Sequence, residues 1–148
     1  MLTTSAKDLA AINDMIELKD LYLSADDVSQ LDLTKCEKLE SINIDTNSFD
    51  LKKVGNPQNL KKLILSLNGI KSISHLGKLQ SLVYLDLYYT PLTVKHLNCL
   101  VSLKKLQTLR LPPGHEARYK LKMALPDCNI IESMRRRRRY STSASISN

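Results

Sequence analysis

Residues 60–70 read Leu-Lys-Lys-Leu-Ile-Leu-Ser-Leu-Asn-Gly-Ile, a segment in which apolar residues recur in the frame L-x-x-L-x-L-x-x-N-x-I. The same frame appears twice before this segment and twice after it. Successive frames start 21, 21, 22 and 24 residues apart, at Leu18, Leu39, Leu60, Leu82 and Leu106. A nearly constant period of this length indicates stacked structural repeats, each of which buries its apolar side against its neighbours.

With these letters at this period, the chain resembles the leucine-rich repeat family over about residues 15–131. The resemblance implies an α/β fold, a right-handed solenoid bent into an arc. Its concave side would carry a parallel β-sheet with one strand from each L-x-L core, and its convex side helical or 3₁₀ segments. The fourth repeat is longer, and its apolar residues at helical spacing predict an outer helix over residues 93–100.

The repeats are expected to occupy residues 18–113, and residues 1–17 to form a helical N-terminal cap. Ser5 and Asp8 fit the start of that helix, and apolar residues follow them at helical spacing. Within the repeats, Asn47 and Asn68 stand where the chain leaves the strand. We expect their amides to be buried and to bond backbone groups of the neighbouring coil, with Thr90 as a weaker substitute at the same position.

The chain after the repeats divides into two further parts. Residues 114–132 are expected to form a C-terminal cap, with a helix over 115–125 followed by a last strand, similar to the closing coil of many bacterial leucine-rich repeat proteins. Residues 133–148 are expected to be a disordered tail, because like charges repel and serine buries little surface. Four side chains of the cap are expected to cover the end of the core, namely Met123, Leu125, Cys128 and Ile130.

The formal net charge of +7 is concentrated in this tail. Five of the positive charges come from Arg135, Arg136, Arg137, Arg138 and Arg139, no acidic residue follows them, and residues 1–134 carry only +2. The repeats therefore lack the basic excess typical of a nucleic-acid-binding domain. Three interpretations of the arginine run stay open: a nuclear-targeting signal or a tail that binds nucleic acid or an anionic membrane surface, a kinase site phosphorylated at Ser141, and a solubilising tail or fragment end with no role of its own.

The sequence contains no recognisable catalytic or metal-binding motif. Its three histidines fall on different repeats, and the patterns H-E-x-x-H, G-x-S-x-G and C-x-x-C do not occur. We therefore expect no enzymatic activity, no cofactor and no metal. Three widely spaced cysteines and an N-terminus unlike a secretory signal favour the cytoplasm, with the nucleus as the alternative for a eukaryotic or host-delivered protein. No apolar run approaches the roughly 20 residues of a membrane-spanning helix.

Side chains alternate along a strand, so the positions around each L-x-L core point out of the concave side. In the third and fourth repeats these positions are apolar and aromatic, and exposed tyrosines are enriched in protein interfaces. We expect a partner-binding patch on this side, made of Tyr22, Ile64, Leu67, Tyr84, Tyr88 and Tyr89, with Lys61, Lys62, Asp86 and Arg110 in a charged rim. In the alternative interpretation, some of these rings fold over neighbouring aliphatic side chains or contact the C-terminal tail.

Taken together, these patterns favour a monomeric, non-catalytic protein–protein interaction module that binds a protein partner through its concave side. One alternative is binding of nucleic acid or an anionic surface, or nuclear targeting, through the arginine tail. Another is a bacterial effector that acts on host proteins, which the bacterial-looking repeats beside a basic, serine-rich tail allow.

Overall fold

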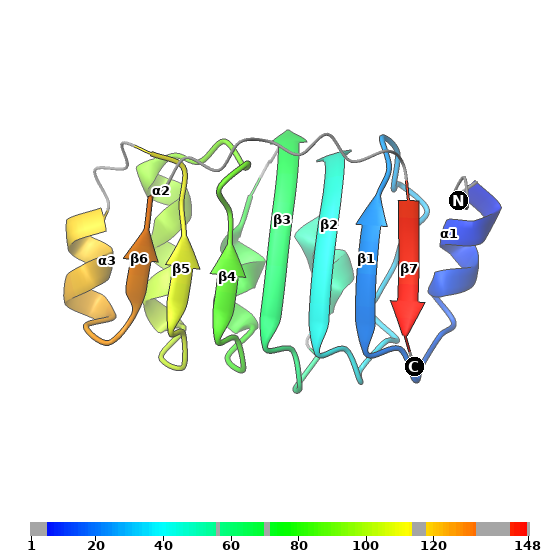
Figure 1. Cartoon of the computed structure of the whole chain (residues 1–148), viewed down its shortest axis with the longest axis horizontal. Coiled ribbons are helices and arrows are strands. Elements are labelled where there is room, and N and C mark those ends of the chain that lie inside the picture. The colour runs from blue at the N-terminus through cyan, green and yellow to red at the C-terminus, as the bar shows by residue number, and fades with distance from the viewer. Residues whose placement is uncertain (1–5, 56, 70–71, 114–117, 133–142, 148) are drawn as a thin grey trace.

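The computed structural model describes residues 6–55, 57–69, 72–113, 118–132 and 143–147. Within these ranges the strands form one seven-stranded sheet in the order β6-β5-β4-β3-β2-β1-β7 (Figure 1). Strands β1 to β6 are parallel and follow the chain order, whereas β7 is antiparallel to β1. The strands are β1 (Asp20–Ser24), β2 (Ser41–Ser48), β3 (Lys62–Gly69), β4 (Tyr84–Asp86), β5 (Thr108–Arg110), β6 (Asn129–Ile131) and β7 (Ser143–Ser147).

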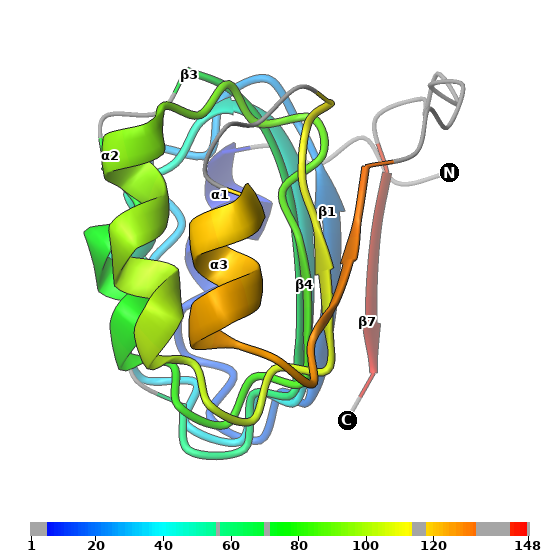
Figure 2. The ribbon, with the colours of Figure 1, turned by 90° about the vertical axis from the view of Figure 1, so that its left-hand side faces the viewer.

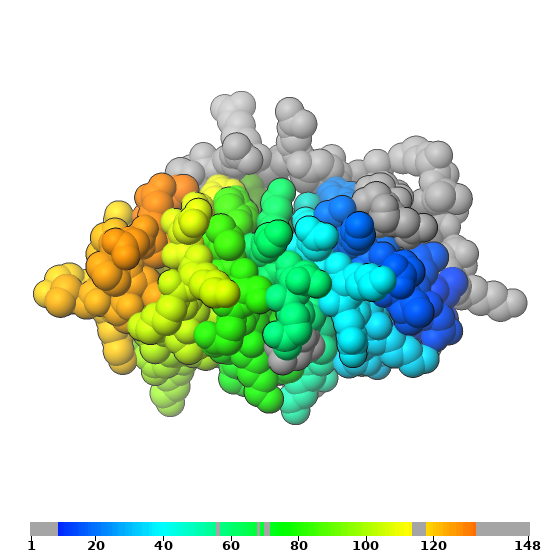
Figure 3. All heavy atoms as spheres, turned by 90° about the horizontal axis from the view of Figure 1, so that it is seen from below, coloured from blue at the N-terminus to red at the C-terminus, as the bar shows by residue number. Residues whose placement is uncertain are grey.

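Helical segments form a second layer, and the view along the long axis shows α2 and α3 on one side and the strands on the other (Figure 2). Successive coils lie side by side in chain order along the long axis (Figure 3). The predicted outer helix of the fourth repeat is one α-helical turn that continues as a 3₁₀ helix. The segments are α1 (Ala6–Ile12), η1 (Leu51–Val54), η2 (Ser74–Lys78), α2 (Val94–Leu97), η3 (Asn98–Ser102) and α3 (Arg118–Ala124), with η denoting 3₁₀ helices.

The core is built from rows of apolar side chains that run across the sheet. The register aligns the first inward position of every coil, and no member of this row is more than 6% exposed. A second row lies two residues further along, because alternate residues of a strand share a face. The first row is Leu21, Ile42, Leu63, Leu85, Leu109 and Ile130, and the second is Leu23, Ile44, Leu65, Leu87 and Leu111.

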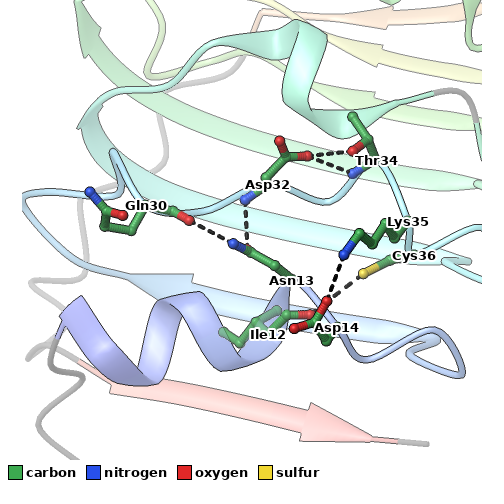
Figure 4. Close-up of polar contacts among 8 residues, drawn as sticks. All are labelled: Ile12, Asn13, Asp14, Gln30, Asp32, Thr34, Lys35 and Cys36. Carbon is green, nitrogen blue, oxygen red and sulfur yellow. Dashed lines mark hydrogen bonds and ion pairs between the residues drawn. The ribbon is translucent and has the colours of Figure 1, made fainter.

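The N-terminal end of the solenoid is held by polar contacts that follow α1 (Figure 4). The Asn13 side chain donates from Nδ2 to the carbonyl of Gln30 at 2.8 Å and accepts at Oδ1 from the N–H of Asp32 at 2.7 Å. It thereby satisfies two backbone groups of the first coil. Leu9 and Ile12 of α1 are each 2% exposed, so the helix covers the open side of that coil.

The predicted buried asparagine is wrong at Asn47, whose side chain is exposed. The reason is the length of β2, which continues to Ser48 and by alternation turns Thr46 inward and Asn47 outward. The prediction for Thr90 is confirmed: its hydroxyl donates to the carbonyl of Leu65 at 3.0 Å and accepts from the N–H of Leu67 at 3.4 Å. The side chain of Asn68 lies outside the described part of the chain.

The C-terminal cap buries Leu125, Cys128 and Ile130 as predicted, but Met123 is 69% exposed. Leu121 of α3 and Leu125, which follows its last residue, are one turn apart and point inward, so Met123, halfway between them, is rotated to the opposite face. The predicted start of this helix at residue 115 lies outside the described residues.

The prediction of a disordered tail over residues 133–148 is wrong for Ser143–Ser147, which form β7. Repulsion among the arginines does not extend to the last residues, which carry no charge and include Ala144 and Ile146. In the described ranges, no helix combines the length and apolarity needed to cross a bilayer.

Candidate functional site

The outward positions of the parallel strands form two rows on the face of the sheet that the helices leave open. The register aligns the middle residue of each L-x-L core, and a second row lies two residues earlier in each strand. The first row is Tyr22, Asn43, Ile64, Asp86, Arg110 and Ile131, and the second is Asp20, Ser41, Lys62, Tyr84, Thr108 and Asn129. Half-buried apolar and aromatic side chains of both rows therefore meet on β3 and β4, at Ile64 and Tyr84.

An ion pair between Asp86 and Arg110 lies beneath this part of the face. Asp86 Oδ2 and Arg110 Nη1 are 2.5 Å apart, and their side chains are only 10% and 9% exposed. Burial opposes the charged guanidinium, yet the Asp86 carboxylate and the Tyr84 hydroxyl hold the pKa of Arg110 above its usual value. Arg110 Nη2 is buried and has no hydrogen-bond partner among the described residues.

The Asp86 carboxylate also lies where β4 ends and the chain turns. Asp86 Oδ1 accepts from the backbone N–H of Tyr88 at 3.0 Å, so the strand stops and turns. Asp86 Oδ2 also accepts from the Tyr84 hydroxyl at the long distance of 3.5 Å. One buried side chain therefore contacts Tyr84, Tyr88 and Arg110 at once.

Three tyrosines near this ion pair make ring contacts with one another or with a cation. The Arg110 guanidinium carbon lies 5.3 Å from the centroid of the Tyr88 ring, and Lys62 Nζ lies 5.9 Å from that of Tyr84. Both distances are within the range of cation–π attraction. Tyr88 and Tyr89 meet edge to face, with centroids 4.8 Å apart and ring planes at 89°. We call this set the tyrosine cluster: Lys62, Tyr84, Asp86, Tyr88, Tyr89 and Arg110.

Two of the predicted assignments on this face are wrong. Leu67 is 0% exposed, because β3 extends to Gly69 and alternation turns Leu67 into the core together with Leu63 and Leu65. Asp86 and Arg110 are 7% and 8% exposed, so they form the floor of the cluster and not a solvated rim. Their pairing had a signal in the sequence, since opposite charges occupy the same frame position of adjacent repeats.

The structure separates Tyr22 from the other predicted site residues. Tyr22 lies on β1, with Asn43 of β2 between it and Ile64, and its pairing partner on the other side is Ser145 of β7. Conversely, Ile131 extends the row beyond Arg110, although the sequence predicted it only as part of the closing strand. The signal for its outward position is the strand alternation, because Ile131 follows the inward Ile130 just as Arg110 follows Leu109.

The predicted tail site, Arg135 to Arg139 with Ser141, lies outside the described residues. Elsewhere, burial raises the pKa of the thiols of Cys36, Cys99 and Cys128, which keeps them protonated and poorly nucleophilic at neutral pH. Within the described ranges, His, Cys, Asp and Glu side chains do not gather in a group of three or more suited to hold a metal ion.

Comparison with known proteins bears on the fold. No protein-family model matches the chain, and no curated protein matches it. The chain is similar to the crystal structure of an internalin (inlF) from Listeria monocytogenes str. 4b F2365, with a TM-score of 0.50 and 20% sequence identity. The similarity covers 87% of this chain and 44% of the internalin chain, so the chain spans less than half of that protein's length. The chain thus has the leucine-rich repeat solenoid fold that its sequence predicted.

Proposed function

We propose that this chain is a non-catalytic module that binds a protein partner through the tyrosine cluster, together with the neighbouring Ile64 and Ile131. The observation that carries the proposal is the buried Asp86–Arg110 pair, whose contacts position Tyr84 and Tyr88 before any partner arrives. Side chains that are already ordered lose little conformational entropy on binding, and this loss is a principal cost of association.

The composition of the cluster matches that of energetically dominant interface residues. Tyrosine and arginine are enriched among them, because each buries a large area and keeps a polar group for hydrogen bonding. Here three half-buried tyrosines adjoin a buried arginine, and Lys62 stands exposed at the border. A partner that covers the rings would remove their remaining surface from water without first having to order them.

The cluster also favours one kind of partner surface. Ile64 and the tyrosine rings offer an apolar centre, whereas Lys61 and Lys62 supply exposed positive charge at one side. A complementary partner presents an apolar or aromatic side chain to the rings and an acidic residue to the two lysines. Charges at such a border chiefly set orientation and association rate, while the rings contribute most of the affinity.

The double substitution Tyr88→Ala and Tyr89→Ala is expected to weaken partner binding at least about 30-fold, the equivalent of a loss near 2 kcal/mol. Affinity purification from the source lysate identifies the proteins retained by the wild-type chain, and titration of the purified partner measures the change. The matched control is Tyr119→Ala, which removes a tyrosine that is 77% exposed on α3, away from the cluster.

The outcome that contradicts the proposal is a double variant that keeps the wild-type circular dichroism spectrum and binds as tightly as Tyr119→Ala. Loss of the folded spectrum would show instead that the two rings are part of the core. Replacement of all five arginines at 135–139 by serine, which leaves β7 in place, tests the arginine-tail alternative. Binding that is lost only in that variant would assign recognition to the tail.

A further inference from the structure

The first strand of the solenoid has an edge that no repeat covers. Strand β1 pairs with β2 on one side, and a parallel strand left open on the other side exposes unpaired N–H and C=O groups. In the structure β7 occupies this edge along its whole length, antiparallel, with Asp20 opposite Ser147 and Ser24 opposite Ser143. The last residues of the chain therefore complete a strand-binding edge at its first repeat.

The strand that fills this edge comes from the far end of the sheet. Strands β6 and β7 stand at opposite ends of the strand order, six inter-strand steps apart, or about 29 Å at the usual spacing of about 4.8 Å. Ten residues, 133–142, connect Glu132 to Ser143. A fully extended chain of that length spans about 36 Å, whereas a flexible one has a root-mean-square span of only about 16–19 Å.

This mismatch lowers the advantage of pairing within one chain. A tether raises the local concentration of its strand most when its average span equals the distance it must cover, and less when it has to be stretched. The backbone hydrogen bonds are the same whether β7 belongs to the same chain or to another. The balance between the two pairings therefore depends on the tether and on the protein concentration, and a distance longer than the average span of a ten-residue tether favours the second chain.

From this arrangement we propose that the β1 edge also binds the Ser143–Ser147 strand of a second copy, so that two chains exchange their C-terminal strands and form a dimer. The exchange is reciprocal: each β1 edge receives one β7, so each β7 has a β1 partner, and two-fold symmetry closes the assembly at two copies. It departs from the monomer that the sequence suggested, and it does not depend on partner binding by the tyrosine cluster.

The directly opposed pair Tyr22 and Ser145 allows pairing within and between chains to be distinguished. Directly opposed residues of antiparallel strands are close enough for a disulfide. One chain carries Tyr22→Cys and another carries Ser145→Cys, both with Cys99→Ala because the Cys99 side chain is partly exposed. The two are refolded together at high concentration, oxidised mildly and separated on a non-reducing gel. Each single variant treated alone is the control.

Strand exchange predicts a covalent dimer in the mixture at a level at least several-fold above that of either variant alone. A chain that carries both Tyr22→Cys and Ser145→Cys tests for pairing within one chain. Such pairing links the two cysteines internally and gives a monomer of altered mobility on the gel. A mixture with no more dimer than its controls, together with an exclusively internal link in the double variant, would overturn the proposal.

Light scattering coupled to size-exclusion chromatography provides an independent measurement. The wild-type chain is expected to shift from monomer to dimer as its concentration rises. Ser145→Pro with Ile146→Pro removes backbone donors from β7 without shortening the chain, and should weaken dimerisation at least about tenfold. A wild-type chain that stays monomeric at every concentration, or a proline variant that dimerises equally well, contradicts strand exchange. Circular dichroism of the proline variant verifies that the repeats remain folded.

Discussion

Replacement of Asp86 by alanine is expected to lower the free energy of unfolding by about 3–5 kcal/mol, the usual cost of removing one member of a buried ion pair. The substitution leaves the Arg110 guanidinium in a site that is 9% exposed, without the carboxylate that compensates its charge. It also removes the acceptor for the Tyr88 N–H at the end of β4. Urea denaturation followed by circular dichroism measures the change.

Two further variants separate charge from packing in this prediction. Asp86→Asn keeps an oxygen that can accept from Tyr88 but not the negative charge, so its loss of stability should be smaller. Asp86→Leu combined with Arg110→Met removes both charges and should be far less damaging than either single substitution, because the unpaired buried charge is what costs most. A loss below about 1 kcal/mol for Asp86→Ala would mean that the pair behaves like a solvated surface bridge.

Leu63→Ala is expected to cost about 2–5 kcal/mol of stability, through lost burial and the cavity left behind. Leu63 is 0% exposed and sits in the middle of the first core row, between Ile42 and Leu85, so both neighbouring coils line the cavity. Thermal and urea unfolding of the full chain provide the measurement. Lys61→Ala, at an exposed position of the same repeat, is the matched control and should stay within about 0.5 kcal/mol of wild type.

Leu67→Ala extends this test to the residue that the sequence placed on the wrong face. A side chain in the core loses stability on truncation, whereas a binding residue on the surface loses affinity and keeps its stability. We expect a loss comparable to that of Leu63→Ala, because Leu67 is equally buried. Unchanged stability in either variant would show that the assigned register of β3 is wrong.

The period of the sequence was sufficient to predict the rows of the core and the layer of helical segments. A leucine that recurs every 21–24 residues must meet its counterparts in the adjacent coils, and the L-x-L frame defines which residues point inward. The outward faces of Ile64 and Tyr84 followed from the same alternation. These predictions held because they depend on spacing, which all five frames share.

The repeat frame does not predict how long each strand is. The wrong faces predicted for Asn47 and Leu67 follow from this. Strands β2 and β3 have eight residues each and β4 has three, although the same letters define them. The difference begins at Asp86, whose carboxylate bonds the Tyr88 N–H and turns the chain, whereas Ile64 at the equivalent position of β3 has no polar group and the strand continues. Leu67 and Thr46 therefore point inward, while Tyr88 and Tyr89 remain half-buried at the surface.

The sequence did not predict strand β7, and the reason is not strand length. Its five residues do not match the repeat frame, and antiparallel pairing with β1 is a contact between distant parts of the sequence that no local pattern encodes. Serine-rich composition alone favours disorder, but an edge strand with unsatisfied backbone groups can order a short segment through backbone hydrogen bonds.

The pairing of Asp20 with Ser147 gives this solenoid a folding property that an open array of repeats lacks. In an open array each coil contacts only its neighbours, contact order is low, and either end frays without affecting the other. Here the β1 amide protons that point toward β7 are shielded by Ser143–Ser147, so their exchange with solvent depends on a segment from the opposite end of the sheet. Until Ser143–Ser147 pair with β1, that edge of the first repeat stays uncovered.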